Sequence, residues 1–144
     1  MTIRYSTVGI VGTGAMGRGI AQIAAQAGST VQLFDLNPEA CRQAHAAIAA
    51  QWDKLQDKGR IDAATADAYK TRLQTAASLG DLRGCDLVVE AAVERLDIKQ
   101  SLFAQLEDIV RPDAVLVTNT SSLSVTAIAA GLKRPAQFAG YHFF

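Results

Sequence analysis

The chain has 144 residues, a length that suits one domain with a substantial core and is too short for two ordinary domains. Lys plus Arg and Asp plus Glu each number 14, so the net charge indicates no nucleic-acid or anionic-membrane partner, and local groups must bind any anionic ligand. No apolar run approaches the about 18 residues of a membrane span, and the amino-terminal residues lack the apolar segment of a signal peptide, which predicts a soluble, cytoplasmic protein.

Strand and helix signals alternate along the chain, a pattern typical of a mainly parallel sheet flanked by helices. The apolar run Val8–Val11 predicts the first strand and ends in glycines. The helix after it has apolar residues at steps of four, three and four, which predict one buried face, and Gly28 is expected to end it. The predicted face consists of Met16, Ile20, Ile23 and Ala27.

The second strand is predicted over Thr30–Asp35, and Asn37 and Pro38 are typical of a helix start. A long helix follows whose apolar positions are Ala44, Ile48, Trp52 and Leu55. The segment 58–60 breaks this helix, and Asp62 can cap a second one that runs through Leu73. A plain mononucleotide-binding unit needs only one helix between its second and third strands, so this helical hairpin indicates a separate role.

The second half of the chain continues the alternation. A weak third strand is predicted near 75–79, a clear fourth over 86–90, a fifth over 114–118 and a sixth over 137–141. A helix with Ile98, Leu102, Leu106 and Ile109 on its buried face precedes Pro112, and a short helix is predicted over 125–130.

A glycine motif, GxGxxG, directly follows the first strand and opens the first helix. A dinucleotide site needs a tight turn at Gly12, close approach of the backbone to a pyrophosphate at Gly14, and close packing of helix on strand at Gly17. The helix start at Ala15 and Met16 supplies free N–H groups to the phosphates. The alternative is that these glycines form only a packed turn.

An acidic residue at the end of the second strand completes the fingerprint, because Asp35 follows Gly17 by 18 residues. Its carboxylate can accept bonds from ribose hydroxyls and would repel the 2′-phosphate of NADP, and the segment 36–38 has no arginine. The sequence therefore predicts NAD as the cofactor. The predicted fold class is α/β: a Rossmann-type, doubly wound, mainly parallel six-stranded sheet with a helical-hairpin insertion between strands 2 and 3.

Three motifs behind this fingerprint, in the segments 86–103, 119–123 and 141–144, resemble the 3-hydroxyacyl-CoA dehydrogenase family. The resemblance is strongest to the bacterial branch that oxidises 3-hydroxybutyryl-CoA or 3-hydroxyadipyl-CoA. It implies that residues 1–144 form the NAD-binding domain and that a helical C-terminal domain, absent from this chain, completes the active site and pairs two subunits in a homodimer. Tyr141 departs from the family, which more often has Leu or Met there.

The resemblance assigns the catalytic roles. His142 matches the base that takes the proton from the 3-hydroxyl group, and Ser121 matches the serine that hydrogen-bonds both the substrate's 3-oxygen and the cofactor. Asn119 lies in the same loop and is a predicted cofactor contact. The alternatives are a histidine that merely ends a strand, and polar residues that only cap the helix near Val125.

The resemblance also places further contacts. Ala92, Glu94 and Lys99 match cofactor-binding positions after the fourth strand, with a solvated Glu94–Lys99 ion pair as the alternative. Lys58 and Lys54, on the helical hairpin, match lysines that bind CoA phosphates, with ordinary solvated charges as the alternative.

Four other residues with reactive or polarisable side chains have no chemical partner near them in sequence, and no metal site is predicted. Structural roles are therefore expected for Cys41, His45, Trp52 and Cys85, the two cysteines as buried thiols in a reducing compartment.

The motifs together predict NAD-dependent oxidation of an L-3-hydroxyacyl-CoA to a 3-oxoacyl-CoA, as in the β-oxidation of fatty acids or in phenylacetate breakdown. The rival interpretations are another β-hydroxyacid dehydrogenase, which lacks the His-Phe-Phe motif, and a non-catalytic structural member such as a lens crystallin. The 144 residues alone are expected to have little or no activity, because the glutamate that partners His142 and the acyl pocket belong to the C-terminal domain.

Overall fold

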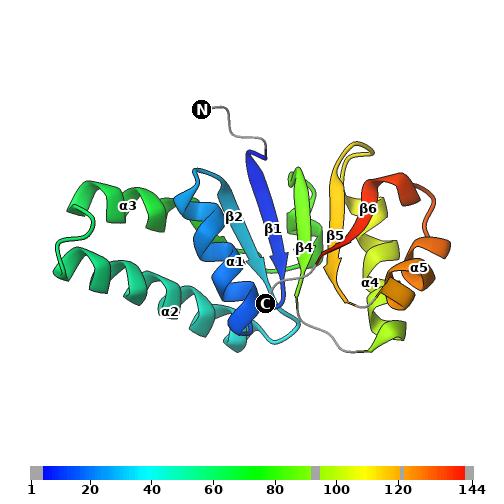
Figure 1. Ribbon diagram of the computed structural model, residues 1–144, viewed down its shortest axis with the longest axis horizontal. Coiled ribbons are helices and arrows are strands. Elements are labelled where there is room, and N and C mark those ends of the chain that lie inside the picture. Colours follow the sequence, from blue (N-terminus) through cyan, green and yellow to red (C-terminus); the bar gives the residue numbers. More distant parts are fainter. Residues whose placement is uncertain (1–4, 92–94, 121, 142–144) are drawn as a thin grey trace.

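The fold is built on one six-stranded, all-parallel sheet with the strand order β3-β2-β1-β4-β5-β6 (Figure 1). The structure, a computed structural model, describes residues 5–91, 95–120 and 122–141, and the predicted site residues Ala92, Glu94, Ser121 and His142 lie outside these ranges. The strands are β1 (Thr7–Val11), β2 (Thr30–Phe34), β3 (Leu73–Thr75), β4 (Leu87–Glu90), β5 (Val115–Asn119) and β6 (Phe138–Tyr141).

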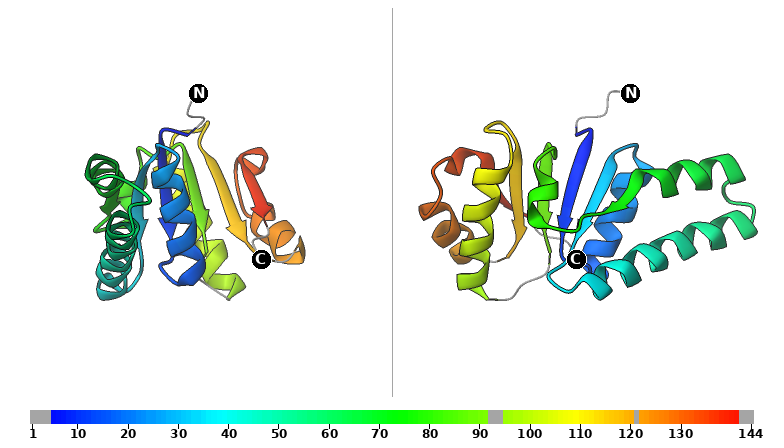
Figure 2. Two further views of the ribbon diagram at one scale, coloured as in Figure 1. Left: turned by 60° about the vertical axis from the view of Figure 1, so that its left-hand side comes forward. Right: turned by 180° about the vertical axis from the view of Figure 1, so that it is seen from behind.

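Helices cover both faces of this sheet, as the doubly wound prediction requires. They are α1 (Ala15–Gln26), α2 (Pro38–Asp57), α3 (Ala63–Arg72), α4 (Leu96–Ile109) and α5 (Ser122–Ala130), with short 3-10 turns η1 (Leu79–Leu82) and η2 (Pro135–Gln137). Figure 1 shows α1 in front of the sheet, and the view from behind in Figure 2 shows α4 in front. The predicted Rossmann-type fold class is confirmed.

Two hydrophobic clusters form because successive strand residues point to opposite faces. On β4, Val88 packs with Phe103 and Leu106 of α4, while its neighbour Val89 packs on the other face with the residues of α1 and α2. Cys85 and Cys41 are buried free thiols, one in each cluster, as predicted.

The buried side of α1 differs from the predicted one. Its buried residues are Gly17, Ala21 and Ala25, whereas Ile23 is 64 % exposed. The prediction was wrong because it followed the largest apolar side chains, while α1 lies so close to the sheet that only small residues fit between them.

The third strand was also misplaced. β3 occupies Leu73–Thr75, directly after α3, and the segment predicted as a strand ends in η1 instead. The Asp81 carboxylate accepts hydrogen bonds from the backbone N–H groups of Ala77 and Ser78, which favours a turn over an extended chain there. The last helix, α5, begins three residues before the predicted start at Val125.

The predicted hairpin of α2 and α3 is confirmed, together with its helix caps. The Asn37 side chain accepts from the N–H of Glu39 at 3.0 Å, and the Asp62 side chain accepts from the N–H of Thr65 at 2.7 Å. Between the helices, Gly59 has φ +71, a left-handed conformation that favours glycine.

Two polar contacts attach this hairpin to α1. The fully buried Trp52 donates its indole N–H to Gln26 Oε1 at 3.0 Å, and Arg72 donates to the Ala25 carbonyl at 2.9 Å. Arg72 thereby satisfies a carbonyl in the last turn of α1. His45 contacts the Leu73 carbonyl through Nε2 at 3.1 Å, so Trp52 and His45 both have the structural roles expected of them.

The described residues contain no helix long and apolar enough to cross a membrane. Over the same ranges, no cluster of His, Cys, Asp and Glu could hold a metal ion.

Two glycines of α1 provide a matched test of how closely this helix packs. A Cβ at Gly17 would lie 1.9 Å from the Gly12 carbonyl oxygen, whereas a Cβ at Gly19 would meet nothing within 4 Å. We expect Gly17→Ala to lower the free energy of unfolding by about 2 kcal/mol or more, because backbone must move. Gly19→Ala should raise it by about 0.5 to 1 kcal/mol through helix propensity. Urea denaturation measures both, and equal effects of the two substitutions would contradict the close packing.

Candidate functional site

The glycine motif forms a turn at the carboxyl end of β1. Gly12 has φ 104 and donates its N–H to the Phe34 carbonyl at 2.8 Å, which joins the turn to β2. Gly14 is the N-cap residue of α1, and a Cβ there would meet nothing within 4 Å. The space beside Gly14 is therefore open next to the start of α1, where the helix dipole and the unpaired N–H groups of the first turn favour an anion.

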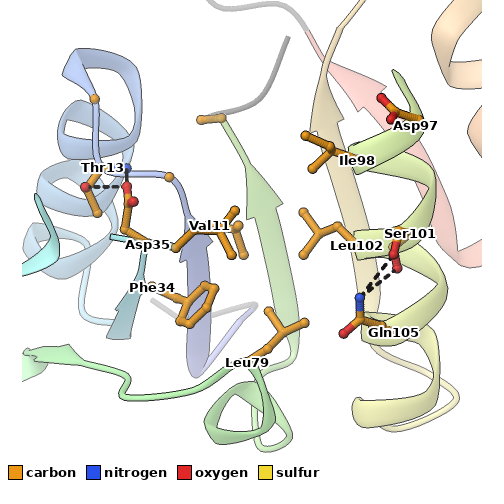
Figure 3. A pocket seen from close by; sticks show the side chains of 14 residues that line it. Val11, Thr13, Phe34, Asp35, Leu79, Asp97, Ile98, Ser101, Leu102 and Gln105 are labelled. Atoms are coloured by element: carbon orange, nitrogen blue, oxygen red, sulfur yellow. Dashed lines mark hydrogen bonds between the residues drawn. The ribbon is translucent and has the colours of Figure 1, made fainter. Parts of the chain in front are cut away.

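Beside this turn, Asp35 is held in a defined orientation. Its Oδ2 accepts from the Thr13 N–H at 3.1 Å and from the Thr13 hydroxyl at 2.7 Å (Figure 3). Its Oδ1 accepts from the Asn37 N–H at 2.9 Å. Sequence reasoning missed Thr13, which is only 3 % exposed. Its hydroxyl orients the carboxylate, so a ligand that hydrogen-bonds to Asp35 would require little reorganisation of this side chain.

A cleft of about 630 Å³ runs from this carboxylate to α4. Its size lies within the range of small-molecule sites. Figure 3 shows Thr13 and Asp35 on one side and the side chains of α4 on the other. The lining residues are Val11, Gly12, Thr13, Gly14, Phe34, Asp35, Leu36, Leu79, Ala91, Asp97, Ile98, Ser101, Leu102 and Gln105. The polar end suits a ribose and a phosphate, and the apolar middle suits a flat ring.

A buried ion pair lies at the carboxyl edge of the sheet, between Glu90 at the end of β4 and Lys99 on α4. The Lys99 Nζ lies 2.8 Å from Glu90 Oε1, and the two side chains are 5 % and 0 % exposed. The Thr118 hydroxyl on β5 donates to the same Glu90 oxygen at 2.6 Å. Lys99 is therefore not the solvated surface charge of the alternative interpretation, and its contact with the cofactor stays a prediction.

This pair is connected to the ends of the neighbouring strands. Lys99 donates to the Asn119 carbonyl at 3.2 Å, and the Asn119 side-chain amide contacts the Met16 sulfur at 2.7 Å. Tyr141 donates its hydroxyl to the Glu90 carbonyl at 3.2 Å. Burial, and secondarily the negative charge of Glu90, raises the pKa of Tyr141 to about 12, so this phenol stays protonated at neutral pH.

The predicted site residues fall into two groups. The fold brings Gly12, Gly14 and Asp35 together in the cleft. It places Lys99 and Met16 in contact with Asn119 at the end of β5. Lys54 and Lys58 are exposed near the far end of α2, in a hairpin that projects beyond the sheet in Figure 1. The structure does not bring these two lysines to the cleft.

We expect the Glu90–Lys99 pair to be costly to break. Glu90→Gln or Lys99→Met should each lower the free energy of unfolding by about 3 to 5 kcal/mol, because each leaves its partner charged and buried. The double substitution should cost less than the sum of the two. Chemical denaturation gives all three values. Lys133, which is 76 % exposed and pairs with Asp108, is the control: Lys133→Met should change stability by about 0.5 kcal/mol or less. If Lys99→Met also changes the free energy of unfolding by about 0.5 kcal/mol or less, the expected cost of breaking the pair is wrong.

Comparisons with known proteins agree with this geometry. Residues 7–144 match the family model of the 3-hydroxyacyl-CoA dehydrogenase NAD-binding domain. The chain is 44 % identical over 144 residues to 3-hydroxyadipyl-CoA dehydrogenase of Escherichia coli, covering 100 % of this chain and 30 % of that protein. It is 44 % identical to a probable 3-hydroxybutyryl-CoA dehydrogenase of Deinococcus radiodurans, covering 94 % of this chain and 48 % of that one.

A solved structure shows the same fold. The crystal structure of 3-hydroxybutyryl-CoA dehydrogenase from Escherichia coli K12 superimposes with a TM-score of 0.92 at 43 % identity, covering 99 % of this chain and 30 % of the other. The chain thus spans about a third to a half of the length of these relatives.

The described residues fit the cofactor that the family name states. Gly14 leaves room for a pyrophosphate at the start of α1, and Asp35 presents a preoriented carboxylate for ribose hydroxyls. The family match, the glycine motif and the cleft all indicate an NAD site, and they disfavour the other β-hydroxyacid dehydrogenases. The chain belongs to the family of NAD-binding domains of 3-hydroxyacyl-CoA dehydrogenases.

Proposed function

We propose that this chain supplies the NAD-binding half of an enzyme that oxidises an L-3-hydroxyacyl-CoA to the 3-oxoacyl-CoA, in a pathway of the β-oxidation type. The observation that supports the proposal most strongly is the Asp35 carboxylate, which Thr13 holds beside the glycine turn and which lines the cleft. The names of the relatives support the substrate class, and they span both 3-hydroxyadipyl-CoA and 3-hydroxybutyryl-CoA.

In this proposal the cleft binds the adenosine half of NAD. Asp35 accepts hydrogen bonds from the ribose hydroxyls, and the N–H groups that follow Gly14 bind the pyrophosphate. The adenine ring contacts the apolar residues Leu79, Ile98 and Leu102. NAD, when bound, would supply the hydride acceptor of the reaction. The protein's part is to bind and orient this group and to move the hydroxyl proton.

The roles of Ser121 and His142 rest on the family motif, and the strand register supports them. β5 and β6 are parallel neighbours in which Asn119 is paired with Tyr141. In the sequence, Ser121 follows Asn119 by two residues and His142 follows Tyr141 directly, and the two strand ends that precede them are neighbours at the carboxyl edge. In the proposal, His142 takes the proton from the 3-hydroxyl group and Ser121 donates a hydrogen bond to the same oxygen.

The rival function is that of a non-catalytic, dinucleotide-binding member of the same family. The retention of both Ser121 and His142 favours the enzyme. A cytoplasmic location is part of the proposal, because two buried free cysteines are compatible with a reducing compartment. Pairing of two copies through sequence outside the NAD-binding domain is likewise proposed, by resemblance to the family.

Cofactor preference tests the nucleotide site. We expect the chain to bind NADH more tightly than NADPH in a fluorescence titration, because Asp35 repels a 2′-phosphate. Asp35→Ala should weaken NADH binding by about 1.5 to 3 kcal/mol, the range for hydrogen bonds to a charged group. Asp57→Ala, which removes an exposed carboxylate at the end of α2, is the control and should leave the affinity unchanged. Equal affinity of the unaltered chain for NADH and NADPH would contradict the assignment of Asp35.

A second experiment tests the substrate half of the proposal. The 144-residue chain, mixed with NADH and acetoacetyl-CoA, should bind both ligands but turn over NADH far below the about 1 to 1000 per second of ordinary enzymes. The reason is that the rest of the active site lies, by resemblance, in sequence outside this domain, so the thioester is not oriented.

The same mixture tests the CoA contacts. Lys58→Ala, and more weakly Lys54→Ala, should lower the affinity for acetoacetyl-CoA at low salt, where contacts between lysine and phosphate are strongest. Lys70→Ala is a control on the same hairpin, because Lys70 is already paired with Asp53. If Lys58→Ala leaves the affinity for acetoacetyl-CoA unchanged, the prediction that the hairpin binds CoA is wrong. Turnover at ordinary rates would show that the cleft is complete within these 144 residues.

A further inference from the structure

Arg18 occupies an unusual place for a cation, in the first turns of α1. The helix begins at Ala15, so Arg18 is its fourth residue and lies near the positive end of the helix dipole. Its Nε donates to the Thr13 carbonyl at 2.9 Å, which turns the side chain back toward the glycine motif. The residue is half-buried rather than fully exposed to solvent.

No carboxylate in the described part of the chain lies within ion-pair distance of Arg18. Arg42, Arg95 and Arg111 each form an ion pair with a nearby carboxylate, whereas Arg18, like Arg72 and Arg134, donates to a backbone carbonyl. A guanidinium has five N–H donors, and the Thr13 carbonyl engages only one of those of Arg18. Among the described residues the remaining donors have no partner, so an anion from outside the chain can bind them.

Thr13 joins this cation to the ribose site. Its N–H and hydroxyl face Asp35, while its carbonyl faces Arg18. Asp35 is the residue that accepts ribose hydroxyls, so a phosphate on the 2′-oxygen would lie beside the same turn. Arginine suits this contact, because its planar guanidinium binds phosphate in a bidentate manner.

We propose that Arg18 is a specificity-determining residue of the nucleotide site, which binds a 2′-phosphate on the adenosine ribose and so opposes the exclusion of NADPH by Asp35. Selectivity for NAD is then the balance of two side chains on either side of Thr13, one repelling and one attracting the phosphate. The chain should discriminate between the cofactors less strongly than Asp35 alone would. The inference rests on the nucleotide site of the proposed function.

The test is a set of NADH and NADPH titrations of the unaltered chain and three variants. Arg18→Gln removes the charge but remains a good helix former, and Arg18→Lys keeps the charge. Arg83→Gln removes an equal charge from an exposed position that follows η1, and it controls for the overall change in electrostatics. We expect Arg18→Gln to raise the Kd of NADPH about tenfold, as for one lost charge-assisted hydrogen bond, and that of NADH less than twofold.

The ratio of the two dissociation constants is the deciding quantity. Arg18→Lys should leave it closer to that of the unaltered chain than Arg18→Gln does, and Arg83→Gln should leave it unchanged. If Arg18→Gln leaves the ratio unchanged, or weakens both cofactors equally, the proposal is overturned; equal weakening would place the guanidinium on the pyrophosphate that the cofactors share. Failure of the unaltered chain to bind NADH would instead overturn the proposed function.

Discussion

The close approach of α1 to the end of β1 is the constraint on which the site depends. A side chain at Gly17 would collide with the Gly12 carbonyl, so the helix can start at the sheet edge only because this position has no Cβ. Gly14, the N-cap residue of this helix, has open space at the position that a Cβ would occupy. This helix start also places Thr13 where it can bind Asp35 through both its backbone N–H and its hydroxyl. One steric requirement thus determines where α1 begins, beside the proposed phosphate site, and how the Asp35 carboxylate is oriented.

The other half of the carboxyl edge is organised by charge. The Glu90–Lys99 pair is almost entirely removed from solvent, and Thr118 donates a hydrogen bond to the carboxylate. Such a pair adds little net stability compared with apolar residues of the same size, since desolvation offsets the attraction. Its contacts link β4, α4, β5 and β6 at the point where Asn119 and Tyr141 end their strands. The strand ends that precede Ser121 and His142 are thereby held in register.

The hairpin of α2 and α3 has a different relation to the site. Trp52 and Arg72 attach it to α1 through Gln26 and Ala25, at the end of α1 opposite the glycine motif. The hairpin is therefore an extension of the nucleotide-binding unit, although its exposed Lys54 and Lys58 do not line the cleft. A ligand that reached both would have to be long, as an acyl-CoA is.

The sequence by itself determined the local features. The glycine motif, the caps Asn37 and Asp62, and the acidic residue after β2 were all predictable, because each depends on spacing over a few residues or on one conformational requirement. The α2 face was predictable as well, since Ala44, Ile48 and Trp52 are both apolar and buried. The resemblance to the family also predicted roles for residues whose function no local pattern could indicate.

The tertiary structure alone decided the rest. Periodicity could not show that α1 buries alanines and exposes Ile23, because that depends on the distance between helix and sheet. It could not pair Glu90 with Lys99 or attach Thr118 to them, because these contacts arise from the order β1-β4-β5 and from the helix packed on it. Arg18 reads in the sequence as one more surface charge. Only the folded structure shows that Arg18 donates a hydrogen bond to the turn that holds Asp35. The spacing of residues in the sequence does not predict that a long side chain folds back in this way.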